Sequence, residues 1–541
     1  MSDFLQKQFA ARVLTVRRRV VGISATAAIG GILLGVAGCG SNLRPTVTPI
    51  TGTGPGSQPA ANAFVISVPT SAGTGTVNKG VATVIDYAGD TISATAPVGP
   101  APFTYTINGG GNTAWTINGD GTVSNIPVNS NLQAKNVTFS TLNPVPVAGS
   151  PGDPKGIDPI VGLFGGALGL YAIDVTLDAT QTHSQIDVLT GSPDAFKLTV
   201  PVDETPVTMV GVGTTSRYYA ISQMIPYLTP VTLDGNTVDG GVACNIDAHG
   251  VGVNGMADGI ETSTYTVSSH IQVGVCPVYA VGTADTKRVF VLNRGSDNIS
   301  VINSQNNAID NCTCPPTGCV NQNGQTYTCH PSLPLTPASG KAHAGPVYAE
   351  YNQTTAQLVV ANYEGNTISI IDVSLDEYGN DSPTFGTTYT VPVGNNPAAV
   401  TVLADGSRAY TANQTDGTVT VINMSSHTVE ATLPVTGHPR TVVSTQNSLY
   451  GKVYVGATDS PYITVIRTDQ DIISTTVLVQ GNTLDVRTGS PDASSSNLNI
   501  VSRLPGAGQP CYLPPGVISA AGAPVTILNC RVQDPTQLGQ Q

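Results

Sequence analysis

One twelve-residue pattern occurs three times without gaps in the second half of the chain. Its copies are LNRGSDNISVIN (292–303), ANYEGNTISIID (361–372) and ANQTDGTVTVIN (412–423), and a fourth copy with one extra residue is VGATDSPYITVIR (455–467). In each copy apolar and polar residues alternate on both arms around a polar turn, which predicts a β-hairpin. A hairpin that recurs in this way indicates a repeat fold, in which each copy forms the same part of one structural unit.

The polar turns are expected to serve the hairpins themselves. Gly295, Gly365 and Gly417 lie in three of them, where we expect backbone geometries that a residue with a Cβ atom adopts reluctantly. Asn362 and Gly365 are therefore interpreted as turn-forming residues and not as ligands. Function is to be sought in the loops between the hairpins.

A second element recurs between the hairpins. VGNNPAAVTVLADGSRAYTAN (393–413) has a counterpart in VGVCPVYAVGTADTKRVFVLN (273–293). Looser copies of its Gly/Pro entry lie around Pro102, Pro151, Pro206, Pro346, Pro439 and Pro510. Their spacing of about forty to seventy residues fits a four-stranded blade with or without a loop insertion. The chain is thus predicted to be an all-β propeller of four-stranded antiparallel blades, forming one domain over 63–541. A β-sandwich or a β-helix is the alternative.

The stretch PAAVTVLADGSRAYTANQTDGTVTVIN (397–423) resembles the YVTN family of β-propeller repeats, and it is similar to the wider lactonase-like propellers. The resemblance covers 273–478, and 64–272 follows it only loosely. It implies seven blades, or eight if 153–170 and 481–509 are parts of blades and not insertions. We expect the ring to close by pairing a strand near 523–530 with the N-terminal blade, which begins at 64–68.

The N-terminal segment carries a targeting pattern. Basic residues precede an apolar, Gly/Ala-rich run at 20–38, and the sequence VAGC ends this run at Cys39. Residues 1–38 thus resemble a bacterial lipoprotein signal peptide, in which that Cys is acylated and becomes the new N-terminus. An ordinary signal peptide or membrane anchor is the alternative. The run at 17–19, Arg-Arg-Arg, is also similar in part to a twin-arginine export signal, and Gly40 favours the outer membrane as destination.

Two features limit which partners are expected, namely the segment after this signal and the charge of the mature chain. Residues 39–62 are rich in Ser, Thr, Pro and Gly without an apolar period, so we expect a flexible tether from the lipid anchor. The chain has 22 Lys and Arg against 35 Asp and Glu, and removal of 1–38 leaves 17 against 34, a net charge of −17. A surface this acidic repels phosphate backbones, so nucleic acid is not expected as a partner.

The cysteines fit an exported protein. Eight remain after the lipidated Cys39, and an even number outside the cytoplasm predicts disulfides: Cys244, Cys276, Cys312, Cys314, Cys319, Cys329, Cys511 and Cys530. Four of them lie in an insertion at about 310–344, where two bridges would stiffen a loop with few apolar residues. Proximity in sequence suggests Cys244 with Cys276 and Cys511 with Cys530. A zinc site with His330 as a further ligand is the alternative, but the spacing lacks paired C-x-x-C knuckles.

Catalytic motifs are sparse. The sequence has no G-x-S-x-G, H-E-x-x-H or P-loop pattern, and its seven His are scattered. The resemblance to lactonase-like propellers implies that chemistry, if present, uses the loops that enter the inner strands. The candidates there are Glu204, His343, Asn396, His438 and Arg440, and the last two, in TGHPRTV (436–442), could face an anionic ligand. Solvated loop residues are the alternative, and no metal ligand or cofactor is predicted.

Two functions are compatible with these features. The first is a non-enzymatic propeller at the cell envelope, which binds an envelope protein or polymer through its rim and its disulfide-stiffened loop. The second is a lactonase-like hydrolase with a polar site at the mouth of the central channel. The first is favoured because no acid/base pair can be named from the sequence.

Overall fold

The computed structural model describes residues between 62 and 488. From residue 248 onward every residue up to 488 is described except 313–318, 322 and 446–450, and between 62 and 244 the described residues are the strands and some of their neighbours. These residues form β-strands joined by turns and loops, with a short 3-10 helix, η3 (Ala248–Gly250). Within this part of the chain, no helix has the length and apolarity needed to cross a membrane.

The described strands form eight antiparallel sheets of four or five strands, which we number as blades in chain order. Blade 1 contains β37 (Asn482–Thr488), β1 (Asn62–Val68), β2 (Lys79–Asp86) and β3 (Thr91–Pro100). Blade 2 contains β4 (Thr104–Ile107), β5 (Thr113–Ile117), β6 (Thr122–Pro127) and β7 (Lys135–Thr138). Blade 3 contains β8 (Ile160–Gly166), β9 (Gly169–Val175), β10 (Ser184–Thr190) and β11 (Ala195–Pro201). Blade 4 contains β12 (Pro206–Val212), β13 (Arg217–Ser222), β16 (Asn254–Glu261) and β17 (Thr266–Val275).

The remaining four blades carry the recurring hairpins. Blade 5 contains β18 (Pro277–Gly282), β19 (Arg288–Asn293), β20 (Asn298–Asn303) and β21 (Ala308–Ile309), with β24 (Ser332–Pro334) also paired to β20. Blade 6 contains β25 (Pro346–Asn352), β26 (Gln357–Asn362), β27 (Thr367–Asp372) and β28 (Thr388–Pro392). Blade 7 contains β29 (Pro397–Val402), β30 (Arg408–Asn413), β31 (Thr418–Asn423) and β32 (Thr428–Pro434). Blade 8 contains β33 (Pro439–Ser444), β34 (Lys452–Ala457), β35 (Tyr462–Arg467) and β36 (Ile472–Leu478). Two short hairpins lie outside the blades, β14 (Pro230–Leu233) with β15 (Asn236–Asp239) and β22 (Cys319–Val320) with β23 (Thr326–Tyr327).

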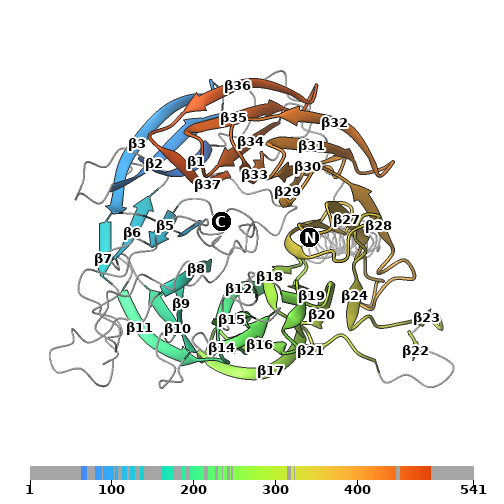
Figure 1. Ribbon diagram of the computed structural model, residues 1–541. Coiled ribbons are helices and arrows are strands. Elements are labelled where there is room, and N and C mark those ends of the chain that lie inside the picture. Colours follow the sequence, from blue (N-terminus) through green and yellow to red (C-terminus); the bar gives the residue numbers. More distant parts are fainter. Residues whose placement is uncertain are drawn as a thin grey trace, which may run out of the picture. The chain divides into compact units, whose positions relative to one another are not determined.

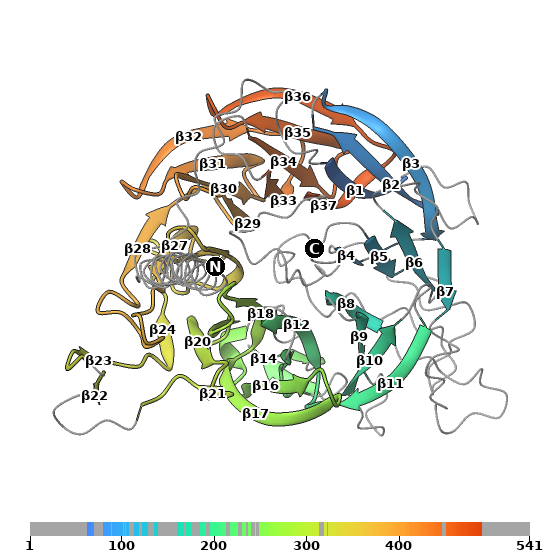
Figure 2. The same cartoon turned by 180° about the vertical axis from the view of Figure 1, so that it is seen from behind.

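The innermost strands of the blades form a closed ring. Each contacts the innermost strand of the next blade, in the order β37, β4, β8, β12, β18, β25, β29, β33 and back to β37. Figure 1 shows the blades in this order around the centre, and the opposite view in Figure 2 gives the same order. The predicted β-propeller of four-stranded antiparallel blades is confirmed, and the recurring hairpin forms the second and third strands of its blade.

The described residues support the larger of the two predicted blade counts. Both stretches that we considered as insertions contain an innermost strand: β8 within 153–170 and β37 within 481–509. Since β8 contacts both β4 and β12, its sheet is a full member of the ring. The entry to β37 lacks the proline of the later copies, since 479–483 reads VQGNT, whereas β8 directly follows Pro159 in the Gly-x-x-Pro sequence 156–159.

The strand that closes the ring differs from the predicted one. The N-terminal blade does begin at β1, but its partner is β37, with Phe64 opposite Arg487 and Val65 opposite Val486. The predicted partner at 523–530 lies outside the described residues. The sequence NTLDVRT alternates as a strand should, and pairing buries Leu484 and Val486 against the ring. The first blade is thus completed by a strand from the other end of the propeller, which covers one edge of β1.

The pattern of burial follows from the position of each strand in the ring. The second strands are buried on both faces, as in β19, β26 and β30, because each blade packs between two others. The outermost strands alternate or are largely exposed, as in β32. Large apolar side chains of neighbouring blades therefore form shared clusters, such as Phe290, Leu358 and Val360 between blades 5 and 6.

A buried asparagine braces the end of the recurring hairpin in its three ungapped copies. Asn362 is fully buried, and its Nδ2 donates to Thr367 Oγ1 at 3.0 Å and to Ser369 Oγ at 2.9 Å. Asn293 and Asn413 make the equivalent two bonds within blades 5 and 7. This side chain joins the second strand to the third, so Asn362 has the structural role that the sequence suggested.

One position in the turn of the recurring hairpin has a left-handed backbone conformation in all three ungapped copies. Asp297 (φ 50°), Asn366 (φ 53°) and Gly417 (φ 64°) occupy it in the three ungapped copies. Asp and Asn are the residues other than Gly that adopt this conformation most readily, which explains their presence here. Of the three glycines named from the sequence, Gly417 alone has a positive φ, so the expected backbone geometry is wrong for Gly295 and Gly365. At Gly365 a Cβ atom would lie 3.0 Å from Ala344 Cα, which is a tight contact.

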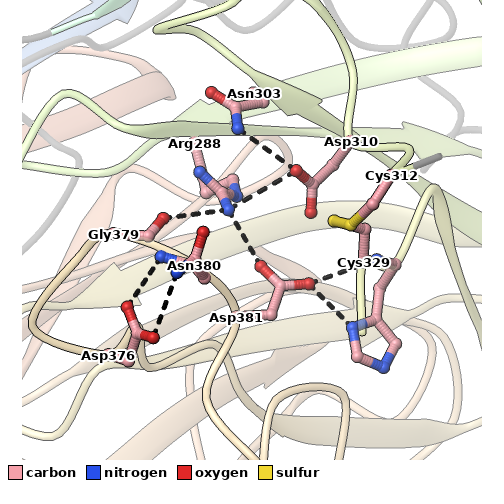
Figure 3. Close-up of a disulfide and its surroundings, with 10 residues drawn as sticks. Arg288, Asn303, Asp310, Cys312, Cys329, Asp376, Gly379, Asn380 and Asp381 are labelled. Carbon is pink, nitrogen blue, oxygen red and sulfur yellow. Dashed lines mark hydrogen bonds and ion pairs between the residues drawn. A yellow bond between two sulfur atoms is a disulfide. The ribbon is translucent and has the colours of Figure 1, made fainter. Parts of the chain in front are cut away.

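The Cys-rich insertion is held to blades 5 and 6 by a buried ion cluster. A disulfide joins Cys312 to Cys329, and Cys319 is also disulfide-bonded, whereas Cys314, Cys511 and Cys530 lie outside the described residues. Figure 3 shows Arg288 of β19 between two carboxylates, with Nη2 2.9 Å from Asp381 Oδ1 and 3.4 Å from Asp310 Oδ1. Asp381 Oδ2 in turn accepts bonds from the backbone N–H and, at 2.7 Å, Nδ1 of His330, which follows Cys329 directly. His330 therefore anchors the insertion to the β27–β28 loop.

Candidate functional site

The predicted candidate residues share one end of the blades. In each later blade the first residue of the innermost strand pairs with the last residue of the second strand, as in Pro346 with Asn362 and Pro397 with Asn413. The loops that enter the innermost strands therefore lie beside the turns between the second and third strands. We call this the entry end, and it contains His343, Asn396 and His438 together with the turns at 294–297, 363–366, 414–417 and 458–461.

The candidates do not converge into one catalytic group. They enter four different blades, with Glu204 before β12, His343 before β25, Asn396 before β29 and both His438 and Arg440 at the start of β33. The Glu204 backbone carbonyl accepts the N–H of Met224 at 3.0 Å. Asn396 joins blades 6 and 7, since its N–H donates to Asn366 Oδ1 at 3.1 Å and its Nδ2 donates to the Tyr363 carbonyl at 3.2 Å.

His438 and Arg440 lie in different environments. The His438 imidazole is half exposed, and its Nδ1 lies 2.6 Å from Asp459 Oδ2, in the turn between β34 and β35. Arg440 is 1% exposed within the innermost strand β33. The imidazole is thus paired with a carboxylate of its own blade while the guanidinium is enclosed, so the two do not form a shared surface for an anion.

His343 belongs to a compact cluster that spans three blades. Its Nδ1 lies 2.8 Å from Oδ2 of Asp297, which is in the β19–β20 turn of blade 5. The His343 ring stacks on the His249 ring of η3 in blade 4, with centroids 3.3 Å apart and planes inclined by 11°. Nδ1 of His249 is 3.6 Å from the same Asp297 oxygen. The potential ligand atoms of the three residues all lie within 4.8 Å of one another, so they could hold a metal ion.

A second layer of polar contacts fixes this cluster. His249 Nε2 lies 2.7 Å from Glu364 Oε2 in the β26–β27 turn, and Arg294 Nε donates to Glu364 Oε1 at 2.7 Å. Burial alone would raise the pKa of Glu364, but His249 and Arg294 outweigh it and lower that pKa to about 2. Burial would lower the pKa of His249, but Glu364, Asp297 and the Gly295 carbonyl raise it overall. Arg294 also donates to the carbonyl of Cys244, whose disulfide to Cys276, the suggested pair, holds this segment against β17.

A second histidine–carboxylate group in the described residues also lies on blade 4, with Asp203 in the loop that enters β12. His270 Nδ1 of β17 is 2.7 Å from Asp258 Oδ1 of β16 and 3.0 Å from Oδ2 of Asp203, and the Asp203 N–H donates to Asp258 Oδ2 at 2.6 Å. Burial raises the pKa of Asp258 to about 7, although the Asp203 N–H and His270 oppose it. One imidazole nitrogen is thus shared by two carboxylates, of which Asp258 is fully buried.

The sequence indicated only one member of the three-blade cluster. Asp297 and Glu364 lie in turns of the recurring hairpin, where polar residues are expected, so nothing marked them as special. His249 lies in an irregular stretch between the second and third strands of blade 4, for which the repeat has no counterpart. The available signal was a departure from the repeat: Glu364 aligns with Gly295 and Thr415, and Asp297 aligns with Gly417.

The chain was compared with known proteins in three ways. No protein-family model and no curated protein matches the sequence. Among solved structures, apo AztD from Citrobacter koseri is similar, at 15% identity and a TM-score of 0.45 over 79% of this chain and 97% of that chain. A provisionally assigned 6-phosphogluconolactonase from Bacteroides fragilis is similar at 12% identity and a TM-score of 0.42, over 79% of this chain and 98% of that one. The dihydro-heme d1 dehydrogenase NirN is similar at 12% identity and a TM-score of 0.48, over 82% of this chain and 77% of that one.

Proposed function

We propose that the chain is a non-enzymatic binding protein of the bacterial cell envelope, which takes its ligand at the entry end of the propeller. One observation carries this proposal: the residues considered for catalysis are distributed over four blades, and His438 and His343 are each engaged with a carboxylate. Acid/base catalysis needs a donor and an acceptor within reach of one substrate atom. Binding needs only a surface with fixed polar groups, which the entry end provides.

The location is the second part of the proposal. Its support is the sequence pattern at 1–38 and Cys39, with the tether at 39–62, all of which lie outside the described residues except Asn62. In this arrangement the lipid at Cys39 holds the propeller at the outer membrane, and its partner is an envelope protein or polymer. Export also accounts for the disulfides, which persist outside the cytoplasm.

The lactonase-like alternative has a direct test. Purified full-length protein is incubated with a panel of sugar lactones and acyl lactones, beside a His438→Ala/Arg440→Ala double variant. We expect no hydrolysis above the buffer rate from either protein. Turnover by the wild type that falls by about 100-fold or more in the double variant would establish a hydrolase and end the proposal.

The location is tested separately. Cells that express the wild type and a Cys39→Ala variant are fractionated, and the protein is followed by immunoblot. We expect the wild type in the outer-membrane fraction and the variant released from it, because a lipid anchor supplies the membrane affinity. Equal membrane association of both proteins would contradict lipidation at Cys39.

A further inference from the structure

We propose that His249, Asp297 and His343 form a binding site for one divalent transition-metal ion, with Zn²⁺ as the ion to test. The inference deepens the proposed function, since it names a ligand class for the entry end. The cluster is built from three blades that come together only in the folded ring.

The distances are close to those of a metal site. Ligands at about 2.1 Å from a tetrahedral ion lie about 3.4 Å from one another. Nδ1 of His249 is 3.6 Å from Asp297 Oδ2, and Nδ1 of His343 is 2.8 Å from the same oxygen. The first separation already fits, and the second needs an opening of about 0.6 Å. Because the two rings are stacked with planes inclined by 11°, the His343 ring must also turn out of the stack so that both nitrogens point at the ion.

The second coordination shell is also present. A metal-bound histidine commonly donates its other ring nitrogen to a carboxylate, which fixes the ring and the tautomer. Here His249 Nε2 lies 2.7 Å from Glu364 Oε2, and that carboxylate is held by Arg294 at 2.7 Å. Nδ1 of His249 donates to the Gly295 carbonyl at 3.1 Å, so the ion has to replace the proton on this nitrogen.

The carboxylate ligand is oriented by the backbone. Asp297 Oδ1 accepts the N–H groups of Ala344 at 2.9 Å and Gly345 at 2.8 Å, so Oδ2 is left to face the two imidazoles. These two N–H groups follow His343 directly, so the same segment supplies a ligand and positions its partner. Such support before binding limits the rearrangement that the ion must impose.

The exposure of the cluster permits entry of an ion. The side chains of His249, Asp297 and His343 are 13%, 24% and 41% exposed, so the first ring is anchored while the last faces solvent. Three protein ligands on a partly open site leave a fourth position for water or for an atom of a partner molecule. Two imidazoles and one carboxylate suit Zn²⁺ and neighbouring transition metals, whereas Ca²⁺ and Mg²⁺ prefer oxygen ligands.

The group at Asp203, Asp258 and His270 serves as a matched control. It has the same types of ligand atom, but it offers one imidazole, and Asp258 is fully buried with both oxygens in contact with Asp203 or His270. We therefore expect this group to hold its own hydrogen bonds and not an ion.

The test is a calorimetric titration of chelator-treated, full-length protein without a polyhistidine tag, using ZnCl₂, MgCl₂ and CaCl₂. We expect one Zn²⁺ per chain at micromolar or tighter affinity and no heat from Mg²⁺ or Ca²⁺. Asp297→Asn, which retains a residue suited to the positive φ, and His343→Ala should each weaken Zn²⁺ binding by about 100-fold or more. Glu364→Gln should weaken it by about 10- to 100-fold, and His270→Ala should leave it unchanged.

Two results would overturn the inference. One is the absence of Zn²⁺ binding by the wild type, and the other is binding that survives in an Asp297→Asn/His343→Ala double variant with unchanged circular dichroism. If Zn²⁺ binding is lost in His270→Ala but retained in the double variant, the ion lies at the control group. This result would also overturn the inference. These results are distinct from a failure of the proposed function. Lactone turnover would contradict the proposed function whether or not Zn²⁺ binds.

Discussion

Replacement of Arg288 by Met should destabilise the propeller more than any loss of a surface ion pair. The guanidinium is 1% exposed, and its Nη2 contacts the carboxylates of Asp381 and Asp310 (Figure 3). Methionine fills a similar volume without charge, so the variant leaves two acidic groups buried between blade 5 and the insertion. Removal of one partner from a buried pair typically costs 3–5 kcal/mol.

The two carboxylates are expected to respond differently. Asp381 keeps the two bonds from His330, whereas Asp310 keeps only the Asn303 amide at 3.3 Å. Burial already raises the pKa of Asp310 to about 6, with Arg288 lowering it, so loss of the arginine raises it further. A carboxyl with a raised folded pKa stabilises the protein while protonated and loses that contribution as the pH rises. We expect a cost of about 3–5 kcal/mol at pH 8 and a smaller cost at pH 5.

Urea unfolding followed by circular dichroism measures the cost, and limited proteolysis shows whether the insertion at 310–344 is released. Arg467→Met is the control, because Arg467 pairs with Asp469 while its own side chain is 46% exposed, and such a surface pair contributes little to stability. The variant Arg288→Met/Asp310→Asn/Asp381→Asn should recover much of the loss. The reasoning is refuted if Arg288→Met costs no more than Arg467→Met, or if the triple variant is no more stable than the single one.

Two further predictions concern blade 4 and the closing strand. Asp258→Asn should flatten the fall in stability between pH 4 and pH 8, because a carboxyl with a pKa of 3.8 unfolded and about 7 folded loses up to about 4 kcal/mol as the pH rises through that interval. Thermal unfolding at several pH values checks this, with Asp203 and His270 unchanged, and an unaltered slope contradicts it. Val486→Lys places a charge at a 1% exposed position of β37 and should lower stability by 3 kcal/mol or more, roughly the cost of an unpaired buried charge. Leu478→Lys, at a 57% exposed position of β36, should have little effect, and equal effects of the two variants would show that β37 does not close the ring.

The sequence predicted the scaffold well because the scaffold is repetitive. Alternation on both arms of the hairpin is set by the two buried faces of each blade, and it appears in the sequence wherever a blade repeats. The closing strand was expected near 523–530, and the place of 153–170 in a blade was left open, because neither β37 nor β8 is followed by a copy of the recurring hairpin. The three-blade cluster was hidden for another reason: His249, Asp297 and His343 are up to 94 positions apart along the chain and become neighbours only through ring packing. The local sequence pattern carries no information about contacts between such distant residues.

The pairing of β1 with β37 has a consequence for the order of folding. Val65 pairs with Val486, so nearly the whole described chain must be available before this contact forms. Contacts between positions so distant in sequence form slowly, because the entropy of the closed loop must be overcome first. Until then one edge of β1 remains open to pairing with another chain. The folding chain therefore passes through a period in which it can associate wrongly, and a chaperone that covers β1 should raise the yield of closed rings.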